Sequence, residues 1–211
     1  MSDQKQVQRF GAAVLMDLPE TNSDTRQWWI DHNEERQRVL AVFSKIPSPK
    51  LEVWKTIKIG TGIKDANGFR QAIKNVEMRI GDWANDMLGK PAFTVATEAT
   101  EVDLVKVTVG ELGFKDGARC DNIYERAKEL GLELCPPEVG PQLRLQYNDQ
   151  PLNEWVLIGM ESIRNSGGDL LGVFGVGRNV VGLWLGSDYG GPGGVWGADY
   201  RWVFVRPRKC Q

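Results

Sequence analysis

One histidine and three cysteines are the side chains in this sequence best suited to nucleophilic or redox chemistry. His32 lies in a polar Asp-His-Asn-Glu-Glu run ahead of a predicted helix, where solvated or capping histidines are far commoner than catalytic ones. Cys120, Cys135 and Cys210 lack the C-x-x-C spacing of a zinc site, and their odd number does not suit a disulfide framework. We therefore expect reduced thiols, and a protein that is not an enzyme.

Two glycine pairs resemble parts of phosphate-binding loops. Gly60-Thr61-Gly62 follows a predicted strand, but Asp65 replaces the third glycine of G-x-G-x-x-G. Gly175-Val176-Gly177 fails the same test at Val180. Asp188 and Asp199 lack the close ligand spacing of a calcium loop. The sequence predicts no cofactor and no bound metal.

The C-terminal run VVGLWLGSDYGGPGGVWGADYRWVFVRPRK, residues 180–209, is rich in glycine. Aromatic and apolar residues interrupt it at a density that flexible linkers avoid, so we expect a rigidly held loop. Between them stand small, polar or tyrosine residues of the kind that adaptable binding surfaces use. These candidate ligand-binding residues are Gly186, Ser187, Asp188, Gly190, Gly191, Gly193, Gly194, Gly197 and Tyr200.

Hydrophobic periodicity predicts an α+β arrangement in the C-terminal half of the chain. A helix is expected over Asp116–Leu130, with Gly131 as its C-terminal cap. Strands are expected over Val102–Val109, Leu143–Tyr147, Trp155–Met160, Leu170–Val176, Val180–Leu185 and Arg201–Arg206.

The N-terminal part is predicted to be mainly helical. A helix over Asn33–Ile46 is followed by a strand over Leu51–Ile59 and by two short helices within Asp65–Leu88, joined at Gly81. This pair could be a DNA-reading helix-turn-helix, although a plain helical hairpin is commoner. Gly89-Lys90-Pro91 is a plausible boundary, which gives a segment 1–90 and a domain 91–211.

Composition limits the classes of partner. The net charge is −2 and hydrophobic residues make up 41% of the chain, which indicates a folded globular protein. No block is basic enough to suggest nucleic acid as the main partner. Neither a signal peptide nor an apolar run long enough for a membrane span is found, so a cytoplasmic location is expected.

The C-terminal tail resembles the variable proteins of diversity-generating retroelements, in which an error-prone reverse transcriptase rewrites a C-terminal segment by mutating template adenines. In that family, asparagine codons of the template stand between fixed residues. The residues that resemble the fixed frame are Trp184-Leu185, Pro192, Trp196, Ala198-Asp199 and Trp202-Val203-Phe204-Val205-Arg206. Gly, Ser, Asp and Tyr between them each arise from AAC or AAT by changing adenines only.

The resemblance, which covers about residues 182–206, implies a C-type-lectin-like fold: a small twisted antiparallel sheet with a packed helix. It implies a binding protein for an unknown ligand, a protein or a cell-surface molecule. Buried Trp184, Trp196 and Trp202 would form the scaffold of the site, and the variable side chains would be exposed together on one face. Alternatives are a formylglycine-generating-type enzyme of the same fold, and a phage or mobile-element structural protein.

Overall fold

The computed structural model describes residues 31–32, 51–167 and 170–208, so the helix predicted over Asn33–Ile46 lies outside the described residues. The chain divides into two units, Met1–Ser48 and Pro49–Gln211. This division differs from the boundary expected near Pro91, because strands on both sides of Pro91 hydrogen-bond in one sheet. The description that follows concerns the second unit.

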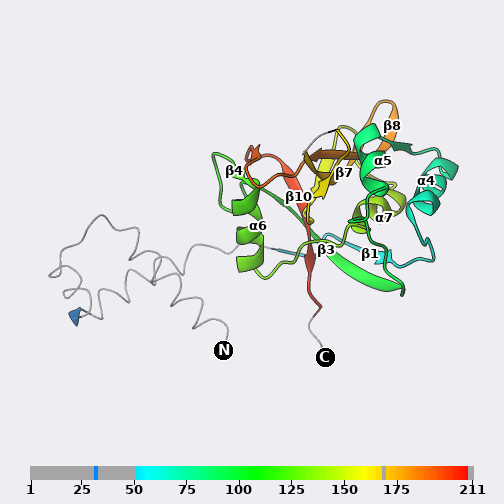
Figure 1. Ribbon diagram of the computed structural model, residues 1–211. Helices are drawn as coiled ribbons and strands as arrows, with labels where there is room; N and C mark the ends of the chain where they lie inside the picture. Colours follow the sequence, from blue (N-terminus) through cyan, green and yellow to red (C-terminus); the bar gives the residue numbers. More distant parts are fainter. Residues whose placement is uncertain (1–30, 33–50, 168–169, 209–211) are drawn as a thin grey trace. The chain divides into compact units, whose positions relative to one another are not determined.

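A sheet of eight strands forms the centre of this unit (Figure 1). Its order is β1-β3-β10-β5-β7-β8-β2, with β6 beside β7, and β4 and β9 form a separate pair. The strands are β1 (Lys55–Ile59), β2 (Arg79–Ile80), β3 (Thr100–Thr108), β4 (Ala118–Arg119), β5 (Trp155–Ile158), β6 (Ile163–Arg164), β7 (Leu171–Asn179), β8 (Gly182–Tyr189), β9 (Val195–Trp196) and β10 (Arg201–Arg206). The sheet is mixed rather than purely antiparallel, because β10 pairs with β5, and β2 with β8, in parallel.

Four helices of the described part cover this sheet, which makes the unit α+β: α4 (Ala66–Asn75), α5 (Asp82–Leu88), α6 (Cys120–Glu129) and α7 (Val139–Gln146). Tyr124 of α6 packs edge-on against Trp202 and Phe204 of β10, with ring centroids 5.6 and 6.0 Å apart. Gly140 of α7 packs against Phe174 of β7. No helix in the described ranges is long and apolar enough to cross a bilayer.

The two helices α6 and α7 lie on opposite faces of the sheet. Trp202 is paired with Leu157, and Leu157 with Gly175, so these three positions share the face that α6 covers. Phe174 is the neighbour of Gly175 in β7, and successive side chains of a strand point to opposite faces. The face that carries Trp202 is named the α6 face below.

Strand β10 confirms the strand predicted over Arg201–Arg206 and lies in the middle of the sheet, between β3 and β5. Trp202, Val203 and Phe204 are fully buried, and Tyr124 of α6 covers the face that carries Trp202 and Phe204. The predicted strands over Val102–Val109 and Trp155–Met160 are confirmed as β3 and β5.

The strand predicted over Leu143–Tyr147 is wrong, because Leu143–Gln146 belong to helix α7 and Tyr147 is its C-cap residue. The alternating polar residues of the predicted strand were Arg144 and Gln146, of which Arg144 is buried and Gln146 is half-buried. One terminal nitrogen of the Arg144 guanidinium donates to the side-chain oxygen of Gln150 at 2.6 Å and to the carbonyl of Gly177 at 3.2 Å, while the buried Nε has no hydrogen-bond partner among the described residues. The alternation of apolar and polar residues therefore did not show which side chains are buried here.

Other elements were predicted with partly incorrect bounds. Helix α6 begins at Cys120, later than expected, and Gly131 adopts φ +79°, which confirms the C-terminal cap. The two helices predicted within Asp65–Leu88 are present as α4 and α5, but strand β2 separates them. Leu51–Ile59 forms a strand only from Lys55 onward.

Removal of the last strand tests this architecture. A chain that ends at Tyr200 loses three fully buried side chains from the middle of the sheet, so we expect it to lose its cooperative thermal transition. A control chain that ends at Pro207 loses Arg208, whose ion pairs with Glu101 and Asp103 are at the surface, and should melt within a few degrees of the full chain. Circular dichroism melting distinguishes the two, and an unchanged melt of the shorter chain would contradict this placement of β10.

Candidate ligand-binding surface

The segment between β8 and β10, residues 190–200, is held in place by its main chain. At its start, Gly190 N donates to the carbonyl of Leu171 at 2.8 Å, and β9 within it pairs with β4. The other main-chain bonds to the rest of the unit are Cys120 N to Gly194 O (2.8 Å), Asp121 N to Pro192 O (3.2 Å), Gly110 N to Ala198 O (2.8 Å) and Val109 N to Tyr200 O (3.0 Å). Such bonds do not depend on side-chain identity, so the segment can keep its path while its side chains change.

Helix α6 depends on the same bonds. Its N-cap residue, Arg119, makes no side-chain capping bond, so the first amides of the helix need other acceptors. The carbonyls of Gly194 and Pro192 accept from the amides of Cys120 and Asp121 and satisfy two of them. The glycine-rich segment therefore serves as the N-terminal cap of the helix that covers β10.

The three scaffold tryptophans differ in burial. Trp196 and Trp202 are buried, as predicted, and their rings meet edge-on with centroids 5.4 Å apart. Trp184 is only half-buried, so its predicted burial is wrong. It lies on β8 beside the two-residue strand β2. The Arg79 guanidinium lies over its ring, 5.5 Å from the ring centroid, and its Nε1 donates to Asn179 Oδ1 at 3.0 Å.

The backbone of the segment does not require its glycines. Within residues 182–206, Gly182 is the only residue with a positive φ angle. Gly186, Gly190, Gly191, Gly193, Gly194 and Gly197 all lie outside the left-handed region. An L-residue can adopt the backbone conformation at each of these six positions, so the space around the Cβ atom decides whether it fits.

That space differs sharply from one glycine to the next. A Cβ at Gly193 would meet no atom within 4 Å, and one at Gly197 would lie 3.1 Å from the Asp199 carboxylate, the end of an exposed side chain. At Gly190 it would lie 2.5 Å from Val173 Cγ1 and 3.1 Å from the Val173 main-chain nitrogen. Gly193 and Gly197 are therefore open positions, whereas Gly190 is closed.

At three further glycines, an aromatic ring occupies the space that a Cβ atom would use. At Gly191 and Gly194, a Cβ would lie under 3.0 Å from the ring of Tyr189, which is itself exposed. At Gly186 it would lie under 3.0 Å from the indole of Trp155. These positions are open only if the ring moves.

The candidate residues are therefore not exposed together on one face, contrary to the expectation. Gly186, Gly190 and Gly191 are buried, while Asp188 and Tyr200 are exposed. Alternation along β8 also places Gly186 and Asp188 on the α6 face and Ser187, half-buried, on the opposite one. Sequence types alone could not reveal the rings that cover these glycines.

A pocket of about 330 Å³ lies beside the start of the segment. It is lined by Cys120, Asp121, Tyr124, Glu125, Lys128, Glu161, Ser162, Gly190 and Pro192. Burial raises the pKa of the Cys120 thiol to about 11, so this thiol is protonated and unreactive near neutral pH. The pocket offers walls for a ligand, and its cysteine is not an activated nucleophile.

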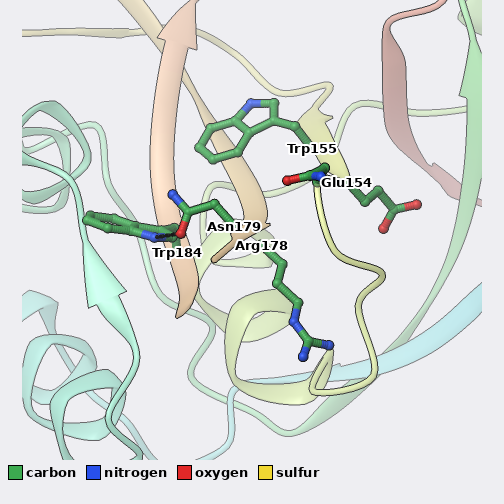
Figure 2. A pocket seen from close by; sticks show the side chains of 6 residues that line it. Glu154, Trp155, Arg178, Asn179 and Trp184 are labelled. Carbon is green, nitrogen blue, oxygen red and sulfur yellow. Dashed lines mark hydrogen bonds between the residues drawn. The ribbon is translucent and has the colours of Figure 1, made fainter. Parts of the chain in front are cut away.

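A second pocket, of about 230 Å³, lies at the other end of β8 and was not predicted from sequence. It is lined by Asn153, Glu154, Trp155, Arg178, Asn179 and Trp184. Figure 2 shows the indoles of Trp155 and Trp184 on either side of Asn179, with the charged ends of Arg178 and Glu154 directed away from them. No local pattern in the sequence marks this pocket. Trp155 and Trp184 come together because both pair with Gly177, and only the strand register reveals this pairing.

The remaining candidates form no further site among the described residues. His32 is exposed. Gly60 and Gly62 have positive φ, and Gly60 N donates to the buried Glu138 carboxylate at 2.9 Å, so these glycines shape a turn. In the described ranges, no cluster of three or more His, Cys, Asp or Glu residues could hold a metal ion.

No family model matches the chain, and no curated protein or solved structure matches it.

The contrast between closed and open glycines gives a direct test. Gly190→Asn should destabilise the protein by about 1–3 kcal/mol, because the new side chain meets Val173 and its main chain. Gly193→Asn is the matched control and should stay within about 0.5 kcal/mol, because the space beside it is empty. Urea unfolding of the full chain measures both, and equal stabilities of the two variants would contradict the assigned clearances.

Proposed function

We propose that the unit Pro49–Gln211 is a non-enzymatic ligand-binding domain with a C-type-lectin-like fold. Its binding surface is formed by the end of β8 and by the segment between β8 and β10, and retroelement-directed adenine mutagenesis diversifies that surface. The ligand is a protein or a cell-surface molecule.

One observation carries this proposal: main-chain bonds and two buried tryptophans fix the segment, and the side chains of its candidate variable residues add only the edge-on contact of Tyr200 with Trp196, 5.0 Å between ring centroids. A surface that changes from copy to copy needs this separation, because each new side chain must leave the scaffold intact. Surface substitutions of this kind typically change stability by about 0.5 kcal/mol or less. The six glycines without positive φ fit the same requirement, since their backbone accepts other residues.

The path of the chain is compatible with the proposed fold. Strand β3 and the C-terminal strand β10 pair antiparallel over six residue pairs, and α6, α7 and the β7–β8 hairpin lie between them in sequence. The proposed surface is the end of that hairpin together with the connection from it back to β10. Its position at the end of the hairpin gives ligands access to the exposed side chains of Asp188 and Tyr200.

Clearances refine the set of diversified positions. Ser187, Asp188, Gly193, Gly197 and Tyr200 are the open set, because each is half-exposed or exposed and a Cβ at either glycine would meet no core atom. Gly191 and Gly194 join them in variants where Tyr189 turns away, and Gly186 joins them in variants where Trp155 turns away. Gly190 belongs to the fixed frame.

The enzymatic alternative gains no support from the described thiols. A formylglycine-generating-type site would contain a pair of reactive cysteines. Cys120 and Cys135 are free and buried, and the Cys135 sulfur is directed at the carbonyl of Val203 at 3.4 Å. Burial also raises the pKa of Cys135.

A library test follows from the open set. Randomising Ser187, Asp188, Gly193, Gly197 and Tyr200 together in the full chain should leave most members resistant to protease, because the main-chain bonds persist. Selection against a panel of unrelated proteins should then yield binders whose specificity follows these residues. A library that mostly unfolds, or a folded library without a single binder, would contradict the proposal.

The coding sequence supplies an independent test. If template asparagine codons gave rise to these residues by changes at adenine only, the codons for Ser187, Gly193 and Gly197 should all end in C or T, whereas Asp188 and Tyr200 have such codons whatever their origin. An adenine-rich near-copy of codons 182–206 should lie beside a reverse-transcriptase gene. Codons ending in A or G at several of these positions would argue against adenine-directed diversification.

A further inference from the structure

Trp155 lies flat on a floor of three glycines on the α6 face. Strand register places Trp155 opposite Gly177, and Gly175 opposite Gly186, across β5, β7 and β8. A Cβ added at any of the three glycines would come within 3.0 Å of the indole ring. The ring therefore occupies the space that side chains at these positions would use.

The indole is seated without a partner for its polar atom. Its Nε1 is buried and has no hydrogen-bond acceptor, and the ring as a whole is only half-buried. A buried N–H without an acceptor loses its hydration and gains nothing in exchange. Turning the indole toward solvent would let Nε1 donate a hydrogen bond to water. That gain would offset the loss of the apolar contact with the glycines.

Gly186 differs from the other two floor positions. Gly175 and Gly177 lie on β7, outside the segment that resembles the variable region, whereas Gly186 lies within it. Its backbone accepts any L-residue, since its φ is not positive. A diversified residue at 186 therefore competes directly with Trp155 for one space.

We propose that Trp155 is a specificity-determining residue of the ligand surface and that residue 186 sets its position. With glycine at 186, as in this chain, the indole lies on the sheet and forms a wall of the pocket it shares with Asn179 and Trp184. With a side chain at 186, the indole turns out and presents its face to the ligand. This inference rests on the proposed function, because it treats position 186 as diversified.

The two positions of the ring suit different partner surfaces. A projecting indole is a typical anchor for a hydrophobic pocket on a protein partner, since tryptophan is enriched among the residues that dominate binding energy. A seated indole leaves a flatter surface with a shallow aromatic pocket. A single replacement at position 186 would thus change the shape of the site in addition to the side chain at that position.

The test uses the full chain labelled with 5-fluorotryptophan and followed by ¹⁹F NMR, with the Trp155 signal assigned from Trp155→Phe. Gly186→Asn should move the Trp155 signal toward that of solvent-exposed tryptophan and increase its H₂O/D₂O shift, while the signals of buried Trp196 and Trp202 stay in place. Gly193→Asn, the matched control at an open glycine, should leave Trp155 unchanged.

A folded Gly186→Asn variant with an unmoved Trp155 signal would overturn the inference. Should Gly186→Asn unfold the chain, the double variant Trp155→Ala/Gly186→Asn decides: recovery of the folded spectrum supports competition for one space, and persistent unfolding overturns it. Either negative result leaves the open positions 187, 188, 193, 197 and 200, and hence the proposed function, unaffected.

Discussion

Main-chain hydrogen bonds between the glycine-rich segment and the start of α6 are the interaction on which this unit most depends. The carbonyls of Pro192 and Gly194 cap the helix whose Tyr124 packs on β10, and β9 pairs with β4 just before that helix. Breaking the bond to the buried Cys120 would leave its amide without an acceptor, at about 1–3 kcal/mol. The segment is thus a structural part of the fold, and its side chains are available for another purpose.

Glycine serves two physically different purposes here. At Gly175, Gly177 and Gly186 the missing side chain makes room for an aromatic ring, and at Gly190 it makes room for Val173. At Gly193 and Gly197 nothing in the fold demands glycine. The glycines are therefore of different kinds: Gly175, Gly177 and Gly190 belong to the fixed frame, Gly193 and Gly197 are open display positions, and Gly186 becomes a display position where Trp155 turns out.

Much of the fold follows from local sequence, but the site does not. Strand β10 and the Gly131 cap were predictable because their signals are local: a dense apolar run and a glycine after a helical stripe. Helix α7 was missed because Arg144 is buried, with partners from other parts of the chain. The clearance at Gly186 depends on Trp155, a residue on another strand, so only the strand register could reveal it.

The central claim is that the path of the segment is independent of its displayed side chains. Amide hydrogen exchange tests it most directly, in a variant with all five open positions replaced. The account predicts unchanged protection at the amides of Cys120, Asp121 and Gly190, whose acceptors are main-chain carbonyls. Loss of protection at these amides in an otherwise folded chain would show that the side chains hold the segment, which contradicts the account.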